Sequence, residues 1–384
     1  MEIECDVLVI GCGPAGAAAA RASALAGAKT LVVEKKEKIG EPVACGEAIG
    51  ACYLGMLPFQ IPEEQLLLRL DGMKIGYNGH SAERTGGIWP GYAIDRARFD
   101  KFLAHEAMQA GAKVMASTSP ISMELSGNEI ASVLLSFSGK QMAVSPRAVV
   151  AADGVNSGVA ERLGLLRKGE GISGEIHSWE MRGVTPDSLS FDQIFIGDFV
   201  DAGYGYIFPK GNGVANVGVG SIIPKLGMEE YFVRFLEHPA VKRQVSGAEM
   251  FLEKSKSAPF GDALDSSFSG NVFFAGDAAN QNIKPFVEGI LPGVICGDIA
   301  GKTAAEFAKG MAQASEYCFR VSSAMPELAQ SSLLAKLMLK AFKLEPERQN
   351  PMLYLLASGI AGAGEAEALL EKSAEELKSL VERG

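Results

Sequence analysis

The sequence is poor in several features that would assign it to a specialised class of protein. Only six of its 384 residues are cysteine, and no two of them form a C-x-x-C pair. We therefore expect neither a disulfide framework nor a zinc site, and a reducing compartment suits such scattered thiols. The four histidines lack metal-ligand spacing, so no metal site is predicted.

Positive charge and long apolar runs are also scarce. Lys and Arg number 36 against 46 Asp and Glu, a net charge of −10, so nucleic-acid binding through a basic surface is not expected. A membrane-spanning helix needs about 18 or more apolar residues, and no such run is present. The N-terminus begins with a strand pattern rather than a secretory signal. These absences indicate a cytoplasmic protein.

What is present begins with a strand, a helix and a second strand in residues 7–34, VLVIGCGPAGAAAARASALAGAKTLVVE. Val7 to Ile10 are all apolar, as a strand buried on both faces requires. The glycines of G-x-G-x-x-G follow: Gly11 permits a tight turn, Gly13 lets backbone approach a pyrophosphate, and Gly16 lets the helix pack on the strand. Glu34 ends the second strand and can accept hydrogen bonds from ribose hydroxyls. This pattern predicts a dinucleotide site without separating FAD from NAD.

Further motifs decide between FAD and NAD, because they resemble the motifs of a known protein family. Residues 149–158 read VVAADGVNSG, residues 271–280 read NVFFAGDAAN, and PFVEGI follows at 285–290. A glycine fingerprint, a DG motif and a late GD motif in this order resemble the FAD-dependent family of p-hydroxybenzoate hydroxylase. Within it, CGE at 45–47 and YGYIFPK at 204–210 resemble the geranylgeranyl reductases, whose second motif is Y-x-W-x-F-P-K. The similarity runs from residue 5 to about 310.

The resemblance implies bound FAD and a set of residues that contact it. Asp277 would hold a ribityl hydroxyl, and the helix opened by Gly289 and Ile290 would direct N–H groups at the flavin. A backbone contact to the adenine end is expected near Ile121. For Arg96, the alternative is an ion pair with Asp95 or Asp100 at the start of a helix. The implied contacts are Ala15, Glu34, Cys45, Gly46, Ala48, Arg96, Asp277, Gly289 and Ile290.

Three positions depart from the reductase pattern. Val287 stands where the reductases usually carry the first glycine of G-E-G-I, which would move the backbone near the flavin. Tyr206 replaces a tryptophan, and Ala48 stands where close relatives carry glycine.

The resemblance favours a reductase of isoprenoid double bonds, in a membrane lipid or a prenyl diphosphate. An aromatic hydroxylase or halogenase is the enzymatic alternative, but Ala160 and Asn280 stand where the hydroxylases usually carry Arg and His. The alternative from another class is an electron-transfer flavoprotein serving a quinone or a partner protein. The electron donor stays open between NADPH, ferredoxin and a reduced deazaflavin. A lipid substrate would require at least transient, peripheral contact with a membrane.

The CGE motif carries the candidate catalytic residues. Reduction of an isolated double bond requires a proton on one carbon as hydride reaches the other, so an acid or an ordered water must stand opposite the flavin. Cys45 and Glu47 are the nearby candidates, and the sequence does not choose between them. The structural alternatives are a buried apolar cysteine and a solvated glutamate.

Tyr204, Tyr206 and Phe208 alternate along one predicted strand and therefore share one sheet face. We expect this row to wall an apolar tunnel for an isoprenoid chain; a simple core face is the alternative. Residues 333–349, LLAKLMLKAFKLEPERQ, predict a helix that either rests on a membrane or, as we favour, covers a core with its lysines in water.

The predicted fold class is α/β: a Rossmann-type FAD-binding domain with a parallel sheet, an antiparallel-sheet substrate domain and a C-terminal helical part. The FAD-binding domain is expected in residues 1–70, 95–166 and 268–310. The substrate domain would take residues 71–94 and 167–267, and the helical region 311–384.

Overall fold

The computed structural model of the protein describes residues 2–167, 169 and 171–384. At its centre is a six-stranded sheet of order β19-β20-β13-β2-β3-β9, in which all neighbours except β19 and β20 pair in parallel. The strands are β2 (Val7–Ile10), β3 (Thr30–Val33), β9 (Lys113–Met115), β13 (Ala148–Ala151), β19 (Phe268–Ser269) and β20 (Val272–Phe274).

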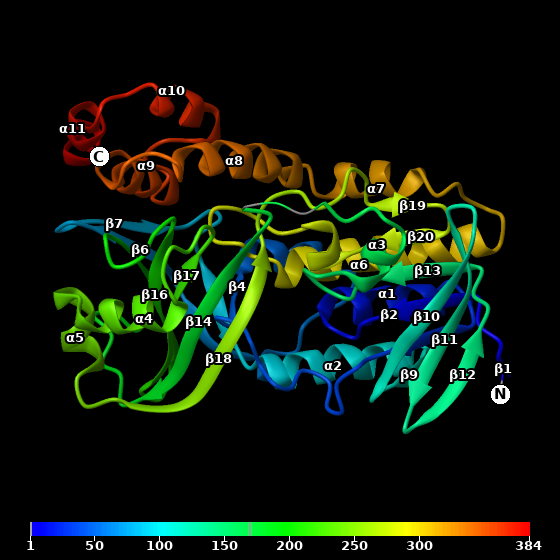
Figure 1. Ribbon diagram of the computed structural model, residues 1–384. Coiled ribbons are helices and arrows are strands. Elements are labelled where there is room, and N and C mark those ends of the chain that lie inside the picture. Colours follow the sequence, from blue (N-terminus) through cyan, green and yellow to red (C-terminus); the bar gives the residue numbers. More distant parts are fainter. Residues whose placement is uncertain (1, 168, 170) are drawn as a thin grey trace.

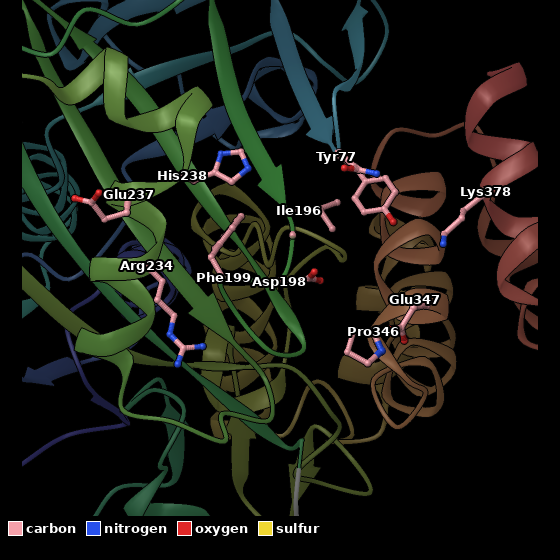
Figure 2. A pocket seen from close by; sticks show the side chains of 12 residues that line it. Tyr77, Ile196, Asp198, Phe199, Arg234, Glu237, His238, Pro346, Glu347 and Lys378 are labelled. Carbon is pink, nitrogen blue, oxygen red and sulfur yellow. The ribbon is translucent and has the colours of Figure 1, made fainter.

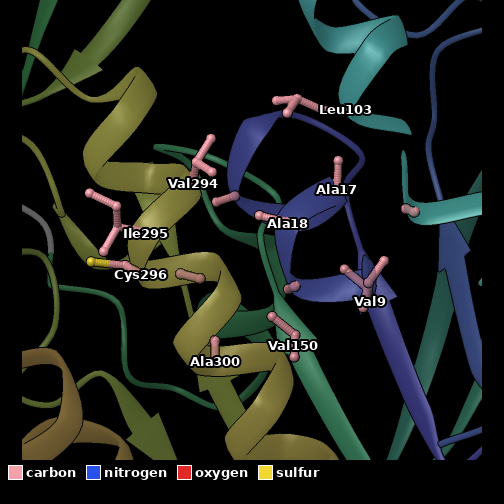
Figure 3. Close-up of a cluster of buried hydrophobic side chains, with 14 of the residues drawn as sticks. Val9, Ala17, Ala18, Leu103, Val150, Val294, Ile295, Cys296 and Ala300 are labelled. Carbon is pink, nitrogen blue, oxygen red and sulfur yellow. The ribbon is translucent and has the colours of Figure 1, made fainter. Parts of the chain in front are cut away.

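Both faces of this sheet are buried, as its apolar runs predict. Val7 and Val9 of β2 face a cluster formed with α1 (Pro14–Leu25), α2 (Arg96–Gln109) and α6 (Ile290–Ala308), part of which Figure 3 shows. Leu8 and Ile10 face the opposite way, against a second, four-stranded sheet. That sheet has the order β1-β12-β11-β10, with β1 (Glu2–Ile3), β10 (Thr118–Ser126), β11 (Glu129–Phe137) and β12 (Lys140–Val144).

Helices α1 and α6 approach each other unusually closely. A side chain at Gly297 would overlap the carbonyl group of Ala15, and one at Gly301 would overlap that of Ala19. The predicted alanine-rich helix and its glycine-bearing partner thus pack backbone to backbone. The two helices run in the same direction, so their N-termini lie at the same end, where the candidate site forms.

A seven-stranded sheet of order β18-β14-β17-β16-β15-β6-β7 forms the other half of the molecule (Figure 1). Most neighbours are antiparallel, as predicted, but β15 pairs with β6 in parallel. The strands are β6 (Gly72–Tyr77), β7 (His80–Thr85), β14 (Ser173–Arg182), β15 (Phe191–Ile196), β16 (Gly203–Gly211), β17 (Val214–Ser221) and β18 (Glu249–Pro259). Helices α4 (Met228–Glu237) and α5 (Pro239–Val245), which the sequence analysis missed, cover one face.

The C-terminal helices cover the other face of this sheet, along one side of the molecule (Figure 1). They are α8 (Glu327–Ala341), α9 (Pro346–Ala357), α10 (Ala366–Leu370) and α11 (Ala374–Arg383). Helix α7 (Glu316–Ala324) packs instead with α6, through Tyr317 and Val321. Leu334 and Met338 of α8 are buried while Lys336 and Lys340 are exposed, so the segment covers a core as favoured. The segment is broken near Glu345 into two helices.

A small sheet and a short helix complete the fold. A small sheet of order β4-β8-β5 contains β4 (Ala48–Gly50), β5 (Leu66–Leu70) and β8 (Gly91–Ile94), and α3 (Gly158–Arg162) follows β13. The predicted α/β fold class is confirmed. The division into domains stays a proposal. In the described residues, no helix combines the length and the apolar character that crossing a membrane demands.

Candidate active site

The three fingerprint glycines occupy three different environments. Gly11 has φ +98°, a conformation that favours glycine, and a side chain there would overlap the carbonyl oxygen of Ala152. A side chain at Gly16 would overlap the carbonyl oxygen of Gly11, so helix and strand can approach only without it. At Gly13 an added Cβ would meet nothing within 4 Å. The first and third glycines therefore build the turn, whereas the second leaves backbone open to a ligand.

Glu34 follows β3 directly, and its carboxylate is held by two backbone donors. The N–H of Cys12 donates to Oε2 at 2.8 Å, and the N–H of Lys36 donates to Oε1 at 2.9 Å. The side chain is thus fixed beside the glycine turn, and lone pairs on both oxygens stay available for ribose hydroxyls.

The late GD motif follows β20 and meets the start of α1. Gly276 has φ +67°, and an added Cβ would lie 2.7 Å from Cβ of Ala15. Asp277 pairs with Lys256, Nζ to Oδ2 3.1 Å, and its other carboxylate oxygen lies 3.2 Å from where Gly289 would carry a Cβ. Neither N-cap residue, Gly13 for α1 or Gly289 for α6, supplies a side-chain cap.

These residues fit FAD. Open backbone at Gly13 and the uncapped N-terminus of α1 suit a pyrophosphate, because helix N-termini present free N–H groups and a positive dipole end. Glu34 suits the ribose hydroxyls, and Asp277 stands where a polyol hydroxyl can be accepted. The uncapped N-terminus of α6 offers the same type of donors to an electron-rich ring edge.

The predicted CGE loop lies against the seven-stranded sheet. Glu47 has φ +63°, which is uncommon for a residue other than glycine, and its N–H donates to Sγ of Cys45 at 3.3 Å. The carbonyl oxygen of Gly46 accepts from Nδ2 of Asn216 at 2.9 Å. A Cβ at Gly46 would lie 2.9 Å from the ring of Phe208, so the loop rests on the predicted aromatic row.

Glu47 is not solvated but belongs to a buried ionic cluster. Its Oε2 accepts from Nζ of Lys254 at 2.6 Å and from Nζ of Lys210 at 2.7 Å. Both ammonium groups also contact Glu180, at 2.8 and 3.1 Å, and Asn216 completes the cluster. The side chains of Glu47 and Lys254 are each 1% exposed. Burial alone would raise the pKa of Glu47, but the two lysines and the N–H of Arg96 lower it to about 2.

This cluster predicts a loss of stability in acid. Because folding lowers the pKa of Glu47 from 4.5 to about 2, its contribution is present above pH 4.5 and is lost as pH falls toward 2. The contribution is about 3 kcal/mol. Denaturant unfolding measured from neutral to acidic pH should show a steeper decline for the wild type than for Glu47→Gln. The exposed control Glu124→Gln should follow the wild type, and equal slopes for all three would contradict the assignment.

Arg96 begins α2, as predicted. Its guanidinium forms a two-bond ion pair with Asp100, at 2.9 and 3.0 Å, which was the structural alternative. Its backbone N–H donates to Oε1 of Glu47 at 2.9 Å. Burial would lower the pKa of Arg96, but Asp100 and Cys45 together raise it. Arg96 therefore lies beside the CGE loop rather than on a remote surface.

The remaining predicted contacts differ in their distance from this centre. Ala48 lies in β4, three residues after Cys45, and Ile290 is buried at the start of α6. Ile121 is 51% exposed at an irregularity of β10. The segment near the dinucleotide turn is the start of that strand, where the N–H of Thr118 donates to the carbonyl oxygen of Glu34 at 2.8 Å.

The aromatic row lies on one face of β16, as predicted. Tyr206 and Phe208 are stacked with ring centroids 4.5 Å apart, and the hydroxyl of Tyr204 donates to the carbonyl oxygen of Phe286 at 3.1 Å. In the sheet register Tyr206 is the partner of Ile194, which is in turn the partner of Ile75. An apolar strip thus crosses three strands beneath the C-terminal helices.

The strip reaches toward a cleft of about 570 Å³ at the far end of the sheet (Figure 2). Ile196 and Tyr77 belong both to the apolar cluster of the strip and to the lining of the cleft. Both cations and carboxylates line the cleft, so its charge favours neither an anionic nor a cationic ligand. Its charged lining consists of Asp198, Arg234, Glu237, His238, Glu347 and Lys378.

Sequence reasoning missed several charged residues of the site. Lys254 and Lys256 are two apart on β18, and this spacing was a usable signal, because alternate residues of a strand share one face. Lys256 lies in the field of Asp277 and Cys45, which raise its pKa. Glu288 was visible in the PFVEGI motif but was not weighed. Its carboxylate accepts from the N–H of Gly50 at 2.7 Å.

The departure at Val287 leaves the backbone in a conformation typical of glycine. Val287 has φ +58°, in the left-handed region, which a β-branched side chain adopts only with strain. Val287 therefore places local strain two residues before Gly289.

The fold and the site define an FAD-dependent oxidoreductase. Residues 6–156 match the family described as FAD dependent oxidoreductase, and residues 90–284 match the family described as FAD binding domain. The chain belongs to the digeranylgeranylglycerophospholipid reductase family. It is 33% identical over 344 residues to such a reductase from Methanococcus aeolicus, covering 88% of this chain and 86% of that relative.

A second relative and a solved structure agree with this assignment. The digeranylgeranylglycerophospholipid reductase of Methanocaldococcus jannaschii is 36% identical over 310 residues, 79% of this chain and 78% of the relative. A geranylgeranyl bacteriochlorophyll reductase-like protein from Thermoplasma acidophilum shares the fold, with a TM-score of 0.84 at 23% identity over 99% of this chain and 100% of that one. The resemblance inferred from the motifs is confirmed.

Proposed function

We propose that the protein uses FAD to saturate the carbon–carbon double bonds of geranylgeranyl chains, in a membrane glycerophospholipid or a prenyl diphosphate. The observation that carries the proposal is the contact between the predicted cofactor side of the site and the aromatic row. The CGE loop, next to the predicted FAD contacts, rests directly on the aromatic row of β16. The names of the two archaeal relatives support the same substrate class.

The predicted cofactor residues take separate roles in this proposal. Gly13 and the N–H groups that follow it bind the pyrophosphate, and Glu34 binds the ribose. Asp277 binds the ribityl chain, while Gly289 and Ile290 present the N-terminus of α6 to the ring. Ala15 and Gly16 keep the N-terminus of α1 close enough to bind the pyrophosphate. Ile121 is assigned to the adenine side of FAD.

Bound and reduced, FAD supplies a hydride to one carbon of the double bond. The chain must hold the alkene, exclude water and deliver a proton to the other carbon. Tyr204, Tyr206 and Phe208 hold the isoprenoid chain by apolar contact. Glu47 is ionised and bound to two lysines, so we assign it a positioning role: its cluster fixes the backbone of Cys45 and Gly46 beside the substrate.

Two partners belong to the same proposal. The electron donor is NADPH, ferredoxin or a reduced deazaflavin, and mixing each with the oxidised enzyme under anaerobic conditions identifies the one that bleaches the flavin. A lipid substrate requires peripheral membrane contact. Met250, Phe251 and Leu252, which are 41%, 39% and 38% exposed on edge strand β18, support such contact.

The substrate assignment has a direct test. The enzyme is reduced anaerobically with dithionite and mixed separately with a digeranylgeranylglycerophospholipid, with geranylgeranyl diphosphate, with a quinone, or with oxygen and an aromatic acid. We expect a geranylgeranyl substrate to reoxidise the flavin rapidly. Reoxidation by quinone alone would indicate an electron carrier, and a hydroxylated or halogenated arene would indicate the alternative enzymes.

A further inference from the structure

Glu288 has a fixed position between the FAD motif and the CGE region. Its backbone exchanges two hydrogen bonds with Ile283, at 2.9 and 3.0 Å, which close the short segment that leads to Gly289 and α6. Its carboxylate lies against Gly50 at the end of β4: both oxygens are 3.0 Å from where a Cβ would stand. Phe286, two residues earlier, packs edge-on against Tyr204 with ring centroids 6.1 Å apart. Glu288 thus lies next to the start of α6, on a segment that also contacts the aromatic row.

The partners of Glu288 do not suit a permanent negative charge. It accepts one hydrogen bond, from the N–H of Gly50, and no lysine, arginine or histidine pairs with it among the described residues. Burial raises its pKa to about 7. The charged or titratable groups that face it are Cys52 and Tyr53 after β4 and Asp192 of β15. Glu47, with two lysines, has the opposite environment.

Asp192 provides an independent observation. It is 7% exposed, and its buried Oδ1 has no hydrogen-bond partner. It lies on the strand face that also carries Ile194, toward the apolar strip. Burial, with a further contribution from Glu288, raises the pKa of Asp192. A buried carboxyl oxygen without a partner is unusual, and polar groups of this type occur at functional sites.

We propose that the carboxyl group of Glu288 is the acid that protonates the substrate double bond, and that Asp192 is its positioning residue. This inference rests on the proposed reductase function. In the reaction the alkene π bond breaks, one carbon gains hydride from the two-electron-reduced flavin, and the other gains the proton of Glu288. The O–H bond of Glu288 breaks and leaves a carboxylate, which water reprotonates before the next turnover.

The variant Glu288→Gln separates this role from a structural one, because a glutamine oxygen can still accept from Gly50. FAD content and unfolding midpoint should match the wild type. Reoxidation of the reduced flavin by a digeranylgeranylglycerophospholipid in detergent micelles should slow by about 10²–10⁴-fold. The wild-type rate should fall as pH rises through about 7, because the acid form is lost there, and this limb should be absent in the variant.

A second readout does not depend on turnover. In infrared spectra of the oxidised, FAD-loaded protein, a protonated-carboxyl band that titrates near neutral pH should be present in the wild type and absent in Glu288→Gln. Asp192→Asn should shift the pH limb while retaining the band of Glu288. The matched control is Glu327→Gln, an exposed carboxylate in the field of the same Cys52 and Tyr53. It should behave as wild type.

The outcomes distinguish the two claims. If the lipid reoxidises wild type and Glu288→Gln at the same rate with the same pH profile, the assignment of Glu288 is wrong and the reductase function stands. If the lipid does not reoxidise the wild-type flavin at all, the proposed function fails and this inference fails with it. A protonated-carboxyl band that still titrates near neutral pH in Glu288→Gln would also overturn the assignment.

Discussion

Replacement of Lys254 by methionine is expected to lower the free energy of unfolding by about 3–5 kcal/mol, because it leaves a buried carboxylate without its nearest cation. Lys254 contacts both Glu47 and Glu180, and its side chain is 1% exposed. Lys210 alone would then face two carboxylates. Denaturant unfolding of the FAD-free protein measures the loss directly.

A double variant provides the control. In Glu47→Gln/Lys254→Met both members of the closest pair are neutral, so a substantial part of the lost stability should return. The variant Lys74→Met removes a partly exposed lysine paired with Glu83 and should cost at most about 1 kcal/mol. If Lys254→Met were no worse than Lys74→Met, the cluster would not stabilise the CGE loop.

The second large effect is expected at Gly297→Val. The added side chain would overlap the carbonyl group of Ala15 and force α1 away from α6, which should destabilise the fold by about 3 kcal/mol or more and abolish FAD binding. Thermal unfolding of the FAD-free protein and flavin titration measure the two consequences separately.

Gly13→Val is the matched comparison. Its side chain enters open space, so the stability of the FAD-free protein should change by less than about 1 kcal/mol while FAD affinity falls steeply. If Gly13→Val destabilised the FAD-free protein, or bound FAD as tightly as the wild type, Gly13 would not be a glycine that FAD binding requires and folding does not.

Local sequence patterns predicted the parts of the fold that they control. The apolar run at Val7–Ile10 and the glycine spacing predicted a strand and helix that the structure contains, and the helix expected to open at Ile290 begins there. These features depend on neighbours close in the chain. Helix α4 escaped notice because the surrounding short strands dominated the interpretation of its segment.

The chemistry of the site was harder to predict because its contacts join distant segments. Glu47 meets Lys254 across 207 positions, and Glu288 meets Gly50 across 238. No periodicity links such pairs, so Glu47 was weighed only as an acid or a solvated residue. The sequence likewise could not show that Glu288 is buried without a cation.

The central claim is that reduced FAD in this site transfers its reducing equivalents to a geranylgeranyl double bond. One anaerobic measurement tests it: the FAD-loaded, dithionite-reduced enzyme is mixed with excess digeranylgeranylglycerophospholipid, and oxidised flavin and lipid mass are quantified together. We predict that each flavin oxidised corresponds to one double bond saturated, with a mass gain of two hydrogen atoms. A lipid that keeps its mass while the flavin stays reduced would contradict the account.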